Sequence, residues 1–181
     1  SCRCSLGYSW DTFSGRGNRN RMDLTQEQKT VIYDYIQNDA TLRALYIDSG
    51  FTTIADALNA SSGSWIVWKT SVTWDEIMRN GMDWTRVDNL TVGKARIWEF
   101  MFKNAENSIN PSKANIRAGI DASWVGTSAD LAVRANVYTH CKRPATIVEK
   151  LLSTGAGTTA APATLVVEGA ISYWDIQTLV Q

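Results

Sequence analysis

Most of this chain carries the hydrophobic period of a helix, and short polar stretches separate one helical pattern from the next. Thr25 and Gln28 have the spacing of a capping box, which starts the first pattern. Asp39 is placed to cap a second helix that stops at Gly50, and residues 51–58 carry a third pattern. This part of the chain therefore predicts three short helices in succession.

The hydrophobic pattern changes after the third of these short helices. Residues 61–64 are polar and predict a loop. Residues 65–72 predict an extended segment, because they hold β-forming side chains without a helical period. Thr73 with Glu76 is another capping box, which opens a short helix. Residues 83–90 are predicted as a turn-rich connection.

Three longer helices are predicted next, and Thr91, Asn110 and Thr127 are their expected caps. Trp98 and Trp124 fall on the apolar faces of the first two helices, so we expect both side chains in the core.

The third of these helices is predicted to turn Leu131, Ala135 and Tyr138 inward. Pro144 should break or kink it, because proline lacks the amide hydrogen that a helix interior needs. Residues 153–162 are rich in Gly, Thr and Ala and predict a loop.

Both ends of the chain differ from its middle. Residues 1–22 have no helical or strand period and predict an extended arm, or else a non-native extension. Residues 155–181 predict a loop and a protruding tail, in which Ser172 with Asp175 caps a last short helix. We therefore expect a mainly α protein with a single helical domain at residues 23–154, short extended segments, an extended N-terminal arm and a C-terminal tail.

The composition favours binding over acid–base chemistry. The chain has eight tryptophans and one histidine, although histidine is the side chain whose ordinary pKa lies nearest neutral pH. Tryptophan buries a large apolar area and is common at protein–protein contacts. Lys plus Arg equals Asp plus Glu, at 18 each, whereas a dedicated nucleic-acid binder usually has a basic excess.

The reactive side chains form no recognisable catalytic or metal site. Cys2 and Cys4 lack a second ligand pair at zinc-site spacing. His140 and Cys141 are adjacent and point about 100° apart on a helix, which does not place a base against a nucleophile. Cys141 is expected in the core, and the few cysteines favour a reducing, intracellular setting. We therefore predict no enzyme activity, cofactor or metal, and no membrane span.

Two sets of side chains are candidates for partner contacts. The first set is aromatic and lies outside the clear helical faces, where partial exposure favours an interface. It consists of Trp10, Trp65, Trp68, Trp74, Trp84, Tyr173 and Trp174. The second set is basic and is a candidate for phosphate or partner contacts, although a helix C-terminus is the favoured setting of its last two members. It consists of Arg16, Arg19, Arg21, Lys142 and Arg143.

Several uncommon strings follow one another along the chain. They are Val67-Trp68-Lys69-Thr70-Ser71-Val72, Ser108-Ile109-Asn110-Pro111-Ser112, His140-Cys141-Lys142-Arg143-Pro144-Ala145-Thr146, and Glu149-Lys150-Leu151-Leu152-Ser153-Thr154-Gly155. In these strings the chain, from Met22 to about Tyr173, resembles a family of small uncharacterised proteins of tailed bacteriophages. The resemblance implies a role in the virion or its assembly, and it brings no catalytic residues.

We therefore predict a structural subunit of a tailed-phage virion, in the head–tail connector, neck or tail, assembled as a ring of identical copies. The alternative in the same class is a capsid decoration or fibre-anchoring protein. A nucleic-acid-binding packaging accessory is the alternative of another class. The expected partners are copies of itself and portal, connector or tail proteins, and DNA contact is not favoured. The expected location is the virion, after assembly in the host cytoplasm.

Overall fold

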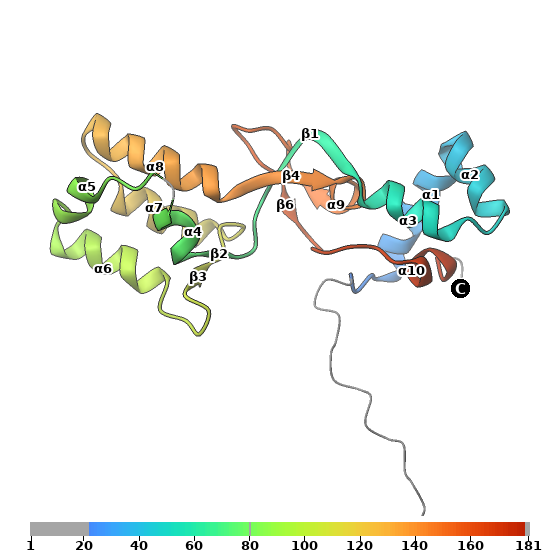
Figure 1. The fold of residues 1–181 in the computed structure, drawn as a ribbon, viewed down its shortest axis with the longest axis horizontal. Coiled ribbons are helices and arrows are strands. Elements are labelled where there is room, and N and C mark those ends of the chain that lie inside the picture. The colour runs from blue at the N-terminus through green and yellow to red at the C-terminus, as the bar shows by residue number, and fades with distance from the viewer. Residues whose placement is uncertain (1–21, 80, 180–181) are drawn as a thin grey trace, which may run out of the picture.

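The structure is a computed structural model that describes residues 22–79 and 81–179. Figure 1 shows an elongated molecule with a group of helices at each end and paired strands between them. Helices make up about 54% of the structure and strands about 15%, so the prediction of a mainly helical protein with short extended segments is confirmed. The predicted N-terminal arm lies outside the described residues, except for Met22.

The first helical group joins the two ends of the described chain. It consists of α1 (Gln26–Asn38), α2 (Ala40–Ile47), α3 (Phe51–Asn59), α9 (Ile147–Leu152) and α10 (Tyr173–Gln177). Its core combines Ile32 and Leu58 from the early helices with Val148 and Ile176 from the late ones and with Leu179, which follows α10. The prediction of a protruding tail is therefore wrong for residues up to 179, because the apolar side chains of α10 complete this core.

Local side chains fix where these helices begin. Oγ1 of Thr25 accepts from the Gln28 amide at 3.4 Å, while the Gln28 side chain accepts from the Thr25 amide at 2.9 Å. Asp39 accepts from the first-turn amides of α2, and Ser172 and Asp175 form the capping box of α10. These predicted caps are confirmed, since each depends on residues only a few positions apart.

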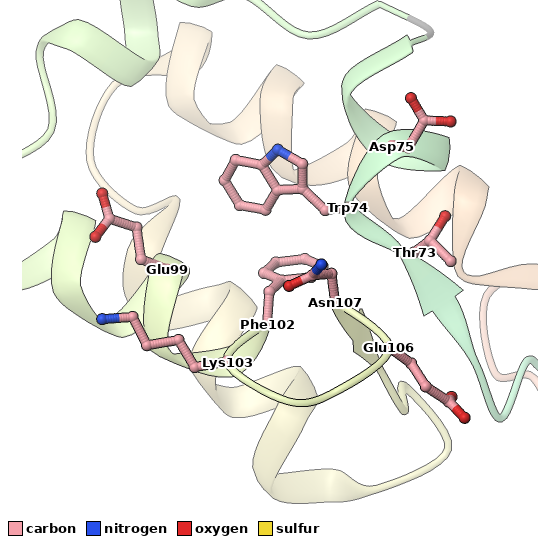
Figure 2. A pocket seen from close by; sticks show the side chains of 8 residues that line it. All are labelled: Thr73, Trp74, Asp75, Glu99, Phe102, Lys103, Glu106 and Asn107. Carbon is pink, nitrogen blue, oxygen red and sulfur yellow. The ribbon is translucent and has the colours of Figure 1, made fainter.

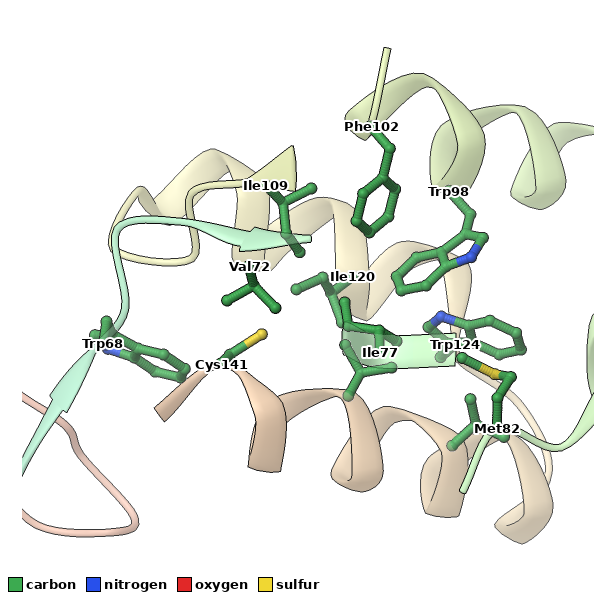
Figure 3. Packing of buried hydrophobic residues seen from close by; sticks show 12 residues of the cluster. Trp68, Val72, Ile77, Met82, Trp98, Phe102, Ile109, Ile120, Trp124 and Cys141 are labelled. Carbon is green, nitrogen blue, oxygen red and sulfur yellow. The ribbon is translucent and has the colours of Figure 1, made fainter. Parts of the chain in front are cut away.

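The second helical group is formed by the middle of the chain. It consists of α4 (Trp74–Arg79), α5 (Trp84–Asp88), α6 (Val92–Met101), α7 (Ala114–Ser123) and α8 (Ser128–His140), with β2 (Val72–Thr73) paired to β3 (Ser108–Ile109). Figure 3 shows Trp98 and Trp124 next to each other in its core. Their rings meet edge to face with centroids 5.4 Å apart. Both tryptophans are fully buried, as their helical positions predicted.

The structure corrects two element predictions in this group. The connection at residues 83–90 contains α5, because Asp83 accepts from two amides of the next turn and caps it. The helix predicted from Asn110 begins only at Ala114. The residues before it pair as β3 with β2, and Oδ1 of Asn110 instead caps a turn by accepting from the Ser112 amide at 3.1 Å.

The inward face of α8 also differs from its prediction. Val133, Val137 and Cys141 are spaced by four and lie in the core, whereas Leu131 is 40% exposed. Tyr138 is only half-buried and packs against the edge of this core. The sequence offered two neighbouring apolar rows on this helix, and the contact with α4 and the tryptophans selects the valine row.

Two paired strands join the helical groups. β1 (Ser61–Trp68) leads out of α3, and the antiparallel β4 (Lys142–Thr146) leads from α8 into α9, with Trp68 opposite Lys142 and Ile66 opposite Pro144. The loop predicted at residues 61–64 therefore lies within β1, where the pairing is irregular. Pro144 occupies a strand and does not kink a helix.

Residues 153–165 pack against the two-stranded ribbon formed by β1 and β4. β5 (Ser153–Thr154) pairs with β6 (Thr164–Leu165). Just before β6, the Ala163 amide donates to Ile66 O at 2.9 Å and the Trp68 amide donates to Ala163 O at 3.0 Å. Ala163 and Leu165 bury their side chains with Val67 of β1 in a small central cluster.

A buried ion pair fixes the end of the ribbon. Nη1 and Nη2 of Arg143 each donate to the Glu149 carboxylate at 2.7 Å, and Nη2 also donates to Glu168 at 2.8 Å. Glu149 is almost fully buried and also accepts from the Thr146 amide, which caps α9. Burial would raise the pKa of Glu149, but Arg143 and the amides of Thr146 and Gly169 hold it below its ordinary value.

The low pKa of Glu149 predicts acid-sensitive stability. The unfolded chain has a Glu149 pKa near 4.3. Above this pH the ion pair contributes fully to the free energy of unfolding, and this contribution is lost as the pH falls through the lower pKa of Glu149 in the folded protein. We expect Glu149→Gln to reduce the free energy of unfolding at pH 7 by about 3 kcal/mol and to flatten its dependence on pH between 5 and 3. Urea unfolding followed by circular dichroism measures both effects. Glu168→Gln, at a more exposed position, should lower stability by less than about 1 kcal/mol, and equal effects of the two changes would contradict this assignment.

A close approach of backbone to an indole ring gives a second stability prediction. Gly157 has a φ of +65°, and a Cβ at this position would overlap the ring of Trp65. We expect Gly157→Ala to destabilise the protein by about 2–4 kcal/mol, from the left-handed backbone and the clash together. Gly63 is the matched control, because its φ is +73° and a Cβ there meets no atom within 4 Å. Gly63→Ala should therefore cost only about 1–2 kcal/mol, and thermal melts of the two variants should differ accordingly.

Candidate functional site

The predicted aromatic contact residues divide into buried and exposed positions. Trp10 lies outside the described residues. Trp68 is buried in the core of the second group, and Trp65 is half-buried and donates to Ser153 Oγ at 3.0 Å. By contrast, Trp84 and Trp174 are 60% and 62% exposed. The apolar area of these two tryptophans is therefore available to a partner.

The two remaining aromatic candidates are half-buried. Tyr173 meets Phe51 and Trp174 edge to face, so it links α10 to α3. Trp74 packs edge to face on Phe102 with centroids 4.8 Å apart. Trp74 therefore combines a structural contact with an accessible surface.

The predicted basic residues also separate. Arg16, Arg19 and Arg21 lie outside the described residues. Arg143 is already paired with two carboxylates. Lys142, directly before it in β4, lines a pocket between α7, α8 and the loop that follows β5. The favoured prediction of a helix C-terminus for this pair is wrong, because α8 ends at His140 and both residues belong to β4.

We call this recess of about 580 Å³ the cationic pocket. Its charged and aromatic lining residues are Trp68, Arg117, Asp121, Arg134, Tyr138 and Lys142. Three cations thus share the pocket with a single carboxylate. Arg117 did not stand out in the sequence, whereas Arg134 lies near Lys142 in a basic stretch of the chain and shares one face of α8 with Tyr138, four residues on.

Aromatic rings and carbonyl groups position two of the cations. The Arg117 guanidinium lies 5.0 Å from the centroid of the Trp68 ring and donates to Pro111 O at 2.7 Å. Nζ of Lys142 lies 5.2 Å from the same centroid and donates to Thr159 O at 2.9 Å. A cation above an indole ring is attracted by the negative face of the ring, so Trp68 holds both charges at the pocket.

The carboxylate of Asp121 orients the other two polar groups. Tyr138 Oη donates to Asp121 Oδ1 at 3.0 Å, and Arg134 Nη1 lies 3.5 Å from the same oxygen. Burial and the hydrogen bond to Asp121 raise the pKa of Tyr138 far above its ordinary value. The hydroxyl therefore remains a hydrogen-bond donor at neutral pH.

A second recess has the opposite charge. Figure 2 shows Trp74 and Phe102 at its centre, with Thr73 and Asn107 beside them. Its charged lining residues are Asp75, Glu99, Lys103 and Glu106, so carboxylates outnumber the cation. This acidic cleft of about 820 Å³ combines an aromatic floor with an acidic rim, an arrangement that suits a cationic side chain.

Exposed apolar side chains lie beside the acidic cleft on α6. Phe100 is 75% exposed, and with Ile97 and Met101 it lines a further recess of about 800 Å³ between α6 and α7. Glu99 of α6 and Lys103, just after this helix ends, line both recesses. Val92, at the start of this helix, is also exposed.

The His140-Cys141 pair does not form a nucleophilic site. Cys141 is fully buried, as predicted, and burial raises the pKa of its thiol to about 12. The thiolate is the reactive form of cysteine, so this residue is inert at neutral pH. Among residues 22–79 and 81–179, His, Cys, Asp and Glu side chains form no group of three or more that could hold a metal ion.

Along the described chain, none of the helices combines the length and apolar character that crossing a bilayer requires. Comparison of the chain with protein-family models, with curated protein sequences and with solved structures gives no match in any of the three.

Proposed function

We propose that this chain is a structural subunit of a tailed-phage virion, in the head–tail connector, neck or tail, and that identical copies assemble into a ring. The resemblance of several strings to small proteins of tailed phages supports the virion as its location, after assembly in the host cytoplasm. Portal, connector and tail proteins are the proposed partners besides the chain itself. The role is adhesive, and the chain needs no catalytic group for it.

The exposed apolar side chains at both ends of the molecule carry this proposal. The second helical group exposes Trp84, Val92 and Phe100, and the first exposes Ile47 and Trp174. These groups lie at opposite ends of the long axis (Figure 1). Large apolar side chains left in water favour association. A contact between unlike ends of two copies repeats around an axis and closes into a ring when the rotation permits it.

The two alternative functions make different demands on the exposed apolar and basic side chains. A capsid decoration or fibre-anchoring protein would need one adhesive end, whereas this chain exposes large apolar side chains in both helical groups. A nucleic-acid-binding accessory would need Arg3, Arg16, Arg19, Arg21, Lys142 and Arg143 on one face, and the structure describes the last two of these residues. Arg143 is instead paired with Glu149 and Glu168, which argues against a continuous track for DNA.

The mass of the assembled protein tests the proposal. We expect the purified chain, alone or with portal or tail proteins, to sediment well above its monomer mass of 20.1 kDa. Phe100→Asp and Trp174→Asp should each shift the population towards monomer, because each buries a charge in the proposed contact. Their melting temperatures should change by only a few degrees, since both side chains are exposed.

Val166→Asp is the matched control for these variants. Val166 is 60% exposed but follows β6 in the middle of the molecule, so its substitution should leave the mass unchanged. A chain that stays monomeric alone and with every virion protein would contradict the proposal. A salt-sensitive shift of DNA mobility would favour the packaging accessory instead.

A further inference from the structure

The cationic pocket has an unbalanced charge. Arg117, Arg134 and Lys142 line it with Asp121 as the single carboxylate. Arg134 is two-thirds shielded from solvent, with 32% of its side chain exposed. Like charges in a partly buried recess repel each other more strongly than in water, because less solvent screens them. An anion bound between these cations would remove that repulsion.

The cations are held in place before any ligand arrives. Carbonyl oxygens of Pro111 and Ser112 accept from Nη1 of Arg117, and Thr159 O accepts from Lys142. A guanidinium carries five N–H donors and an ammonium carries three, so these contacts use part of the donor set. Groups fixed in this way lose little conformational entropy when a ligand binds.

We propose that the cationic pocket binds a phosphate monoester group through Arg117, Arg134 and Lys142. Such a group carries up to two negative charges and three terminal oxygens, which matches three cations lining one recess better than a single carboxylate does. The recess is lined by residues of α7 and α8, by Trp68 and Lys142 of the two strands and by Ala160 of the neighbouring loop. Free phosphate, a nucleotide or the 5′-phosphate of a nucleic-acid strand would supply the same chemistry.

Isothermal titration calorimetry on the full chain at fixed ionic strength tests the site. The probes are inorganic phosphate, a nucleoside 5′-monophosphate with its parent nucleoside, a single-stranded oligodeoxynucleotide with and without a 5′-phosphate, and hexaglutamate. We expect binding of the phosphate-bearing probes that weakens with salt. Lys142→Gln and Arg134→Gln should each weaken it about tenfold, since each removes a charge-assisted hydrogen bond.

Lys103→Gln is the matched control, because it removes the same charge from the acidic cleft on α6. It should leave phosphate binding unchanged. Circular dichroism melts identify a variant that fails to fold, and Lys142→Arg, which keeps the charge, should retain most of the affinity. Equal weakening by Lys103→Gln would overturn the proposal, and so would tighter binding of hexaglutamate than of any phosphate probe, which would assign the pocket to an acidic protein segment.

The probes also distinguish the sources of phosphate. A nucleotide that binds more tightly than inorganic phosphate would support the site with a nucleotide as ligand. Preference for the 5′-phosphorylated strand would support it with a nucleic-acid end. Absence of binding by every phosphate probe would overturn it. These outcomes are independent of the virion role, because the titration uses the isolated chain and measures neither its mass nor its assembly.

Discussion

The antiparallel pairing of β1 with β4 is the constraint on which the rest of the structure depends. The chain leaves the first helical group through β1 and returns through β4, so one ribbon carries both crossings. A two-stranded ribbon is marginally stable by itself in water. Val67, Ala145 and Leu165 give it a small core, and Arg143 ties its end to Glu149. Because Glu149 also caps α9, the same carboxylate positions the strand and the helix that follows it.

This architecture explains why the tryptophans differ in exposure. Dividing the chain into two small cores creates more surface than one core of the same total size. The core of the second group accommodates Trp68, Trp98 and Trp124, whereas the described core of the first group is built from aliphatic residues with tyrosines at its edge. Trp84 and Trp174 remain on the outer helices. Their exposure follows from the shape of the molecule as much as from their positions in the sequence.

The features that could be predicted from the sequence are those that depend on residues close together in the chain. Caps such as Thr25, Asp39 and Ser172 depend on amides within three positions, and each was recognisable from its spacing. Strand β4 was missed because its partner lies some 80 residues earlier and because Pro144 argues against a strand when considered alone. The cationic pocket was half predicted. Lys142 of β4 was a candidate, but Arg117 lies on α7, and the two cations are brought to one pocket only by the folding that places both near Trp68.

The formal net charge of zero conceals this separation of charge. Positive side chains gather around Trp68 and Tyr138, while carboxylates surround Trp74 and Phe102. Electrostatic attraction acts over about one Debye length, roughly 8 Å at physiological salt, so a ligand responds to the local set of charges. A balanced total therefore argues against a protein that coats nucleic acid along its whole surface, but it does not argue against a local anion site. The aromatic residues connect the two observations, since the rings that complete the core also hold the cations at its edge.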